Sequence, residues 1–236
     1  MKNSAVRFFL GKPMAILCCV ALVFFLSGCL DDDTKAVDPV PVGYVSIYHA
    51  SPDAPALDIT VDNKRLNSEP FDYSDYSGYL NFFTGARDVK FSVVNAANTL
   101  LDTTLSVEED KAYSIFVINR LSSIEALVIG DSIITVPAGK AVVRFVQLSP
   151  DAPAIDVTEN SGGTAWFTNA TFKQATGFKE VDAMSYSFKI KAAGTDNVLL
   201  SLDNIELRSG GYYTIVTRGF ASPPAGNTNV LSGEVL

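Results

Sequence analysis

Apolar residues alternate with polar ones along most of the chain, with a period of two rather than 3.6. In residues 44–49, the side chains of Val45, Ile47 and His49 alternate with two tyrosines and a serine. The same period of two runs through residues 88–93 and 186–191. Such runs, rich in β-branched and aromatic residues and separated by Gly, Asn, Asp and Pro clusters, predict strands. No window has the spacing of an amphipathic helix. The pattern therefore predicts an all-β chain whose antiparallel sheets pack as sandwiches.

The pattern occurs twice. The decapeptide Ser51–Thr60 returns as Ser149–Thr158 with eight of ten positions identical, and the offset drifts from 98 to 100 residues toward the end of the chain. Single-residue loop insertions produce such a drift in a duplicated domain. We therefore predict two tandem Ig-like or transthyretin-like antiparallel β-sandwiches that touch, because the link between them is only a few residues long. The predicted domains are residues 43–136 and 140–236.

The repeated decapeptide begins with a turn. Pro52 and Asp53 suit the centre of a type I turn, and Ser51 is able to hydrogen-bond into it. Pro55 excludes helix at the residue before it. A strand follows, in which Ile59 faces the core.

The segment His49–Asp58 resembles the signature of the bacterial domain-of-unknown-function family 4397, which occurs in exported and surface-attached proteins. The resemblance covers both repeats. The second copy departs from it by carrying Gln147 and Leu148 where the first has His49 and Ala50. The resemblance implies a fold and a cell-surface context, and it brings no established activity.

Residues 1–28 are predicted to be a lipoprotein signal peptide. A basic start precedes the apolar run Met14–Leu26, whose 13 residues match a signal-peptide core. Crossing a bilayer takes about 20. Leu26–Cys29 resembles a bacterial lipobox at all four positions, which implies cleavage before Cys29 and its acylation, with palmitate as one expected chain. The alternatives are an ordinary secretory signal or an uncleaved anchor.

Residues 29–42 are predicted to be the acylated cysteine and a flexible tether, since Asp31–Asp33 is a run of like charge and Pro39 and Pro41 disfavour regular structure. We expect this lipid to anchor the protein in a membrane of the cell envelope. By resemblance to sorted lipoproteins, Leu30 replaces the aspartate that retains them at an inner membrane. The outer membrane is therefore the expected location.

Composition removes several classes of function. A net charge of −8 disfavours nucleic acid as a partner. His49 is the one histidine, and the chain lacks both a Gly-x-Ser-x-Gly motif and a glycine-rich phosphate loop. We therefore predict that the protein is not an enzyme. The alternative is a carboxylate-based hydrolase, although Asp58 and Asp62 would lie about 13 Å apart along a strand, beyond the usual glycosidase spacing.

Calcium is the one cofactor that the residues suggest. Asp53, Asp58, Asp151 and Asp156 supply hard oxygen ligands at corresponding places in the two repeats. Their spacing matches no EF-hand loop, and aspartates beside proline turns are also common structural devices.

An aromatic stretch, Phe71–Phe83, suggests a platform for stacking sugars beside carboxylates. The repeat assigns part of it to the core, because Tyr79 aligns with Phe178. Tyr76 aligns with an alanine, and Trp166 has no aromatic partner in the first copy. These two are the predicted exposed rings that contact a ligand.

These features predict a non-enzymatic cell-envelope lipoprotein that presents two β-sandwiches for binding or structural roles. The expected partner is an envelope protein or a glycan. The alternatives are a carbohydrate-binding or adhesive surface module, and a hydrolase whose carboxylates converge only in three dimensions.

Overall fold

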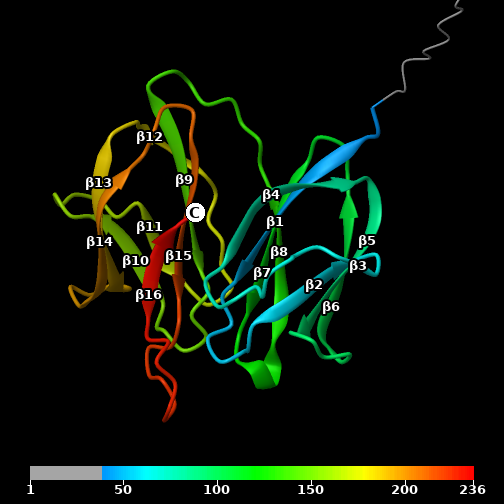
Figure 1. Cartoon of the computed structure of the whole chain (residues 1–236). Coiled ribbons are helices and arrows are strands. Elements are labelled where there is room, and N and C mark those ends of the chain that lie inside the picture. Colours follow the sequence, from blue (N-terminus) through cyan, green and yellow to red (C-terminus); the bar gives the residue numbers. More distant parts are fainter. Residues whose placement is uncertain (1–38) are drawn as a thin grey trace, which may run out of the picture. The chain divides into compact units, whose positions relative to one another are not determined.

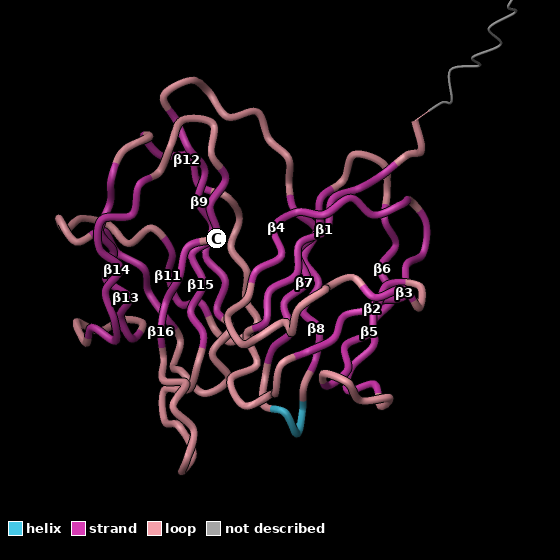
Figure 2. The backbone as a smooth tube through the Cα atoms, in the orientation of Figure 1, coloured by secondary structure: helices cyan, strands magenta, loops and turns pink. Residues whose placement is uncertain are grey.

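The computed structural model describes residues 39–236, and Val40–Leu236 forms one compact unit. The described residues form sixteen strands and a single 3-10 turn at Leu121–Ser123. Figures 1 and 2 show how these elements are arranged. Within them no helix has the length and apolarity needed to cross a bilayer. The predicted signal peptide, Cys29 and nearly all of the tether before Val40 lie outside the described residues.

The first sandwich consists of two four-stranded sheets. Sheet 1a has the order β4-β1-β7-β8, and sheet 1b has the order β3-β2-β5-β6. The strands are β1 (Val42–His49), β2 (Leu57–Val61), β3 (Lys64–Arg65), β4 (Tyr76–Phe83), β5 (Gly85–Val93), β6 (Thr99–Val107), β7 (Ala112–Ile118) and β8 (Glu125–Asp131).

The second sandwich repeats this topology strand for strand. Sheet 2a has the order β12-β9-β15-β16, and sheet 2b has the order β11-β10-β13-β14. The strands are β9 (Lys140–Gln147), β10 (Ile155–Glu159), β11 (Phe167–Ala170), β12 (Lys179–Asp182), β13 (Ser185–Ala192), β14 (Val198–Glu206), β15 (Tyr212–Arg218) and β16 (Ser232–Val235). The predicted all-β fold of two sandwiches is confirmed.

One strand pair in each sandwich runs in an unpredicted direction. β1 is parallel to β7, and β9 is parallel to β15, so sheets 1a and 2a are mixed rather than purely antiparallel. A parallel pair needs a long connection, which the chain provides by visiting the opposite sheet between the two strands. Alternating polarity indicates a strand but does not reveal the direction of its neighbour.

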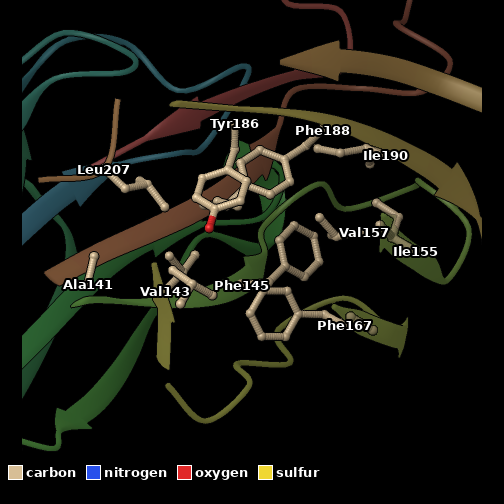
Figure 3. Close-up of a cluster of buried hydrophobic side chains, with 13 residues drawn as sticks. Ala141, Val143, Phe145, Ile155, Val157, Phe167, Tyr186, Phe188, Ile190 and Leu207 are labelled. Carbon is tan, nitrogen blue, oxygen red and sulfur yellow. The ribbon is translucent and has the colours of Figure 1, made fainter. Parts of the chain in front are cut away.

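Each sandwich has its own apolar core between its two sheets. In the second, Phe145 of sheet 2a stacks on Phe167 of sheet 2b with ring centroids 6.3 Å apart (Figure 3). In the first, Val45 and Ile47 of β1 pack with Phe91 of β5. These are the inward positions of the period-two pattern, as expected for strands that bury one face.

A third apolar cluster joins the two sandwiches. Tyr48 and Phe116 of sheet 1a pack with Val146, Leu148 and Val216 of the second sandwich. Tyr48 is therefore buried, although alternation alone would place it on the solvent side of β1. The central strands are covered on both faces, and the predicted contact between the domains is confirmed.

The repeated decapeptide ties each turn to the segment after β7 or β15. The Ser51 hydroxyl donates to the Asn119 carbonyl at 2.6 Å, and Ser149 makes the same bond, also 2.6 Å, to Gly219. Asp53 accepts the backbone N–H of Leu121 at 2.7 Å. Because the serine bond is the same in both copies, the motif has the same structural role in each sandwich.

Candidate functional site

A cleft of about 590 Å³ lies where sheet 1a faces sheet 2a. Its volume falls in the range of small-molecule sites. Both sandwiches supply aromatic rings to its walls, and the remaining walls carry apolar groups and a few hydroxyls. The aromatic lining residues are Tyr44, Tyr76, Tyr79, Phe116, Phe178 and Tyr212.

Three of these rings are strongly exposed to solvent. The exposed fractions are 39% for Tyr76, 47% for Tyr79 and 41% for Tyr212. Exposed apolar surface that gathers in a concave place marks a binding site more often than a scattered hydrophobic residue does. The cleft is therefore the candidate functional site.

A β-bulge aims two of the tyrosines into the same space. Tyr76 and Tyr79 are three residues apart, so in a regular strand their side chains would point to opposite faces. The pairing of β4 with β1 shifts between Ser46 and Tyr48, and Gly78 adopts a φ of 65° at this irregularity. The extra residue of the bulge places both rings on the cleft side.

An ion pair that joins the two sandwiches forms the floor of the cleft. Asp131 at the end of β8 accepts a hydrogen bond from Arg144 Nη1 of β9 at 2.5 Å, and both side chains are 4% exposed. The second carboxylate oxygen accepts hydrogen bonds from the Ser114 hydroxyl at 2.7 Å and the Tyr79 hydroxyl at 2.6 Å. Arg144 Nε donates to the Thr214 hydroxyl at 3.0 Å.

These contacts leave the side chains of the cleft without net charge. The carboxylate of Asp131 is neutralised by Arg144, whose guanidinium also lies over the Phe178 ring, 4.9 Å from its centroid. Although much of the Tyr79 ring is exposed, desolvation of its hydroxyl beside buried Asp131, followed by the hydrogen bond to Asp131, raises the pKa of Tyr79 to about 12. Burial also raises the pKa of Tyr76. Both phenols therefore stay protonated and neutral near pH 7.

The prediction that Tyr79 and Phe178 are core residues is wrong. Tyr79 is nearly half exposed, and Phe178 is only partly buried against Tyr212, with ring centroids 5.7 Å apart. Both rings face the space between the sandwiches. The alignment of an aromatic with an aromatic does indicate a common position in the fold, but that position borders the cleft.

The two predicted ligand-contacting rings lie in different places. Tyr76 lines the cleft, and its contact with a ligand stays a prediction. Trp166 packs edge-on against Tyr186 and Phe188, with both ring centroids 4.9 Å away, and is partly buried against the core of the second sandwich. It lines neither the cleft nor the second hollow described below.

The four aspartates proposed as calcium ligands hold backbone groups instead. Asp53 accepts one N–H as described above, and Asp151 accepts the N–H of Ala221 at 2.7 Å. Asp58 pairs with an arginine at 2.6 Å and accepts a backbone N–H at 3.1 Å, while Asp156 accepts two backbone N–H groups at 2.7 and 2.9 Å. Among residues 39–236 no three His, Cys, Asp or Glu side chains gather to hold a metal ion. This arrangement does not support the calcium hypothesis.

The single histidine is buried away from the cleft. His49 is fully buried, and its Nε2 donates to the Pro55 carbonyl at 3.2 Å. Burial lowers its pKa below the ordinary value. Its counterpart Gln147 is equally buried and accepts the Thr217 hydroxyl at 2.8 Å. Both side chains support the turn of the decapeptide.

Replacing His49 with glutamine, as in the second copy, is expected to reduce the loss of stability in acid. Because the folded pKa of His49 is lowered, the unfolded chain takes up its proton more readily. The contribution of neutral His49 to the free energy of unfolding is therefore fully present above about pH 6.5. Below that pH the free energy of unfolding decreases by up to about 1.4 kcal/mol per pH unit. Urea denaturation at pH 7.5 and 5.0 should show a smaller decrease for His49→Gln than for the original chain. An equal decrease in the variant and the original chain would show that protonation of His49 does not cause the loss of stability in acid.

Comparison with known families gives one match. Residues 43–158 match the family model described as Domain of unknown function (DUF4397). The match covers the first sandwich and runs through the second decapeptide at 149–158. The second sandwich adds a similar β region beyond it. A search of the curated proteins finds no match.

Three solved structures are similar to the chain at low identity. A streptococcal virulence factor described by its alpha-glucan binding is 14% identical, with a TM-score of 0.23, and the alignment covers 74% of this chain and 92% of that one. A proposed adhesin from Bacteroides ovatus is 9% identical, with a TM-score of 0.26 and coverage of 83% and 93%. CBMbc (family CBM26) from Eubacterium rectale Amy13K, solved with maltoheptaose, is 12% identical, with a TM-score of 0.25 and coverage of 82% and 96%. At these TM-scores the similarities carry no argument about the ligand of this chain.

Proposed function

We propose that the chain is a non-enzymatic binding protein of the cell envelope, whose two fused sandwiches form a cleft for a glycan. The observation that carries this proposal is the neutral, tyrosine-lined cleft between sheets 1a and 2a. Each sandwich supplies part of its walls, so the cleft exists only because the chain has two sandwiches.

The chemistry of the cleft suits a neutral sugar. A pyranose ring has apolar C–H faces and a rim of hydroxyls. A site that binds it therefore stacks aromatic rings on the faces and forms hydrogen bonds with the hydroxyls. The exposed rings of Tyr76, Tyr79 and Tyr212 supply the stacking surfaces. The hydroxyls of Ser46 and Thr214 line the same space. Because Arg144 neutralises Asp131, the side chains that line the cleft offer no net charge to a phosphate or a cation.

The arrangement favours binding over hydrolysis. Hydrolysis of a glycosidic bond ordinarily needs two carboxyl groups about 5–9.5 Å apart. Asp131 carries the one side-chain carboxylate that lines the cleft within the described residues, and its oxygens already accept bonds from Arg144, Ser114 and Tyr79. His49 lies under the first decapeptide turn. These contacts support a binding role.

A glycan array probed with the purified, detergent-solubilised full chain tests the proposal. Tyr79→Ala is expected to weaken binding to the retained glycan about tenfold or more, since stacking on an aromatic ring contributes on the order of 1 kcal/mol and more. Phe83→Ala is the matched control, because this ring is also exposed on β4 but does not line the cleft. Thermal denaturation of each variant verifies folding. Retention of no glycan by the original chain, or equal effects of the two substitutions, would contradict the proposal.

The proposed location, including lipid attachment at Cys29, is supported by the sequence alone. Cys29→Ser is expected to abolish incorporation of labelled palmitate and to release the protein from the membrane fraction. Cys18→Ser is the matched control, because that cysteine lies before the expected cleavage point and should leave labelling unchanged. Labelling that survives in Cys29→Ser would show that the lipobox is not used. Separation of inner and outer membranes on a density gradient then tests the proposed outer-membrane location.

A further inference from the structure

A second hollow, of about 370 Å³, lies on the first sandwich beside the cleft. Tyr76 lines both spaces, so the two adjoin at this residue. The other walls come from Ile59 in the middle of β2, from the segment 66–71, from Asp75 and from β4. We propose that this hollow is a second subsite for the same glycan, so that the ligand is an oligosaccharide that crosses Tyr76 rather than a single sugar. This inference rests on the proposed function of the cleft.

The segment that forms the second hollow is held in place by one side chain. Asn67 Oδ1 accepts the backbone N–H of Ile59 at 2.7 Å. Its Nδ2 donates to the carbonyls of Leu57 at 3.0 Å and Glu69 at 2.6 Å. The next residues are secured by Phe71, which exchanges both backbone hydrogen bonds with Leu57 at 3.0 Å. The hollow is therefore preorganised, which reduces the entropy lost when a ligand binds.

The second hollow offers carboxylate oxygens that no ion pair within the described residues engages. Glu69 is exposed, and its carboxylate makes no hydrogen bond within the described residues. Asp75 uses Oδ2 to accept the N–H of Asp72 at 2.8 Å and has Oδ1 left over. Sugar hydroxyls donate well to carboxylates, because bonds to a charged acceptor are stronger than neutral ones. Phe71 and Leu80 supply apolar surface in the same space.

The second sandwich lacks the ring on which this arrangement depends. Tyr76 aligns with Ala175, which packs against the cluster between the sandwiches and forms a bridge with Val146. The small side chain gives the second copy no ring to line two spaces. The acidic hollow therefore lies beside the strand β4 that carries both Tyr76 and Tyr79.

Binding of oligosaccharides of increasing length tests the inference. The probes are maltose to maltoheptaose, cellobiose to cellohexaose and the N-acetylglucosamine dimer to hexamer, titrated calorimetrically into the detergent-solubilised full chain. Affinity in the series that binds is expected to rise about tenfold once the ligand is long enough to cross Tyr76. Glu69→Ala should remove that gain while leaving the affinity for the shortest ligand unchanged. Tyr79→Ala should weaken binding at every length.

Glu109→Ala is the matched control, because it removes the same charge from an exposed position outside both hollows. Binding that does not depend on length, or a Glu69→Ala variant that keeps the gain, would overturn the second subsite and leave the cleft proposal standing. Equal effects of Glu69→Ala and Glu109→Ala would also overturn it, as a general charge effect. Failure of all three series to bind would overturn this inference, whereas the proposed function falls only if the glycan array also retains no glycan.

Discussion

Replacing Asp131 with alanine is expected to lower the free energy of unfolding by about 3–5 kcal/mol, since it leaves the guanidinium of Arg144 buried without its counter-charge. Arg144 retains only hydroxyl partners, Ser114 and Thr214, together with the face of the Phe178 ring. Urea denaturation, followed by tryptophan fluorescence and by circular dichroism, measures the change.

Two further variants test whether the lower free energy of unfolding of Asp131→Ala comes from the unpaired charge of Arg144. The double variant Asp131→Ala/Arg144→Met should recover much of the loss, because removing both charges leaves no buried ion uncompensated. Glu125→Ala removes an exposed ion pair between the same two sandwiches, Lys173–Glu125, and should cost about 1 kcal/mol or less. A double variant as unstable as Asp131→Ala would mean that the loss arises from packing at the cleft floor.

Gly219→Ala is expected to destabilise the second sandwich by about 3 kcal/mol or more. Gly219 has a φ of +82°, and a Cβ added there would lie 2.2 Å from the Val230 carbonyl oxygen. The backbone must therefore move, and the hydrogen bond that Gly219 accepts from Ser149 moves with it. Thermal and urea denaturation measure the loss.

Gly226→Ala separates the two causes of this loss. Its φ of +84° is nearly the same, but no atom lies within 4 Å of the added Cβ, so only the conformational cost of about 1 kcal/mol applies. Equal losses in the two variants would show that the close approach to Val230 has no consequence. In the first sandwich the corresponding residue is Asn119, whose φ of 71° is one that asparagine tolerates better than most residues.

The duplication and the strands were predictable because they depend on local patterns. The period-two alternation around Val45 and Ile47 identifies the inward face of β1, and the two decapeptides identify equivalent turns. The direction of β1 relative to β7 was not predictable, because alternation is the same in parallel and antiparallel strands.

The cleft depends on contacts that no local pattern contains. Tyr48 is buried by a sheet about a hundred residues away in the chain, and the bulge at Gly78 changes the direction in which Tyr79 points. One signal was nevertheless present: Arg144 interrupts the apolar run of β9, where its counterpart in the first copy is Ser46. A lone charge within a buried strand requires a partner, and a search for that partner would have led to the contact between the sandwiches.

The interface between the sandwiches uses equivalent positions on its two sides. Tyr48 corresponds to Val146, and Phe116 corresponds to Val216, and all four belong to the shared apolar cluster. A self-complementary surface of this kind is the signature of a twofold symmetric homodimer. Here one chain carries both halves of the surface, so equivalent positions are free to hold different residues, and Arg144 stands on one side where Ser46 stands on the other.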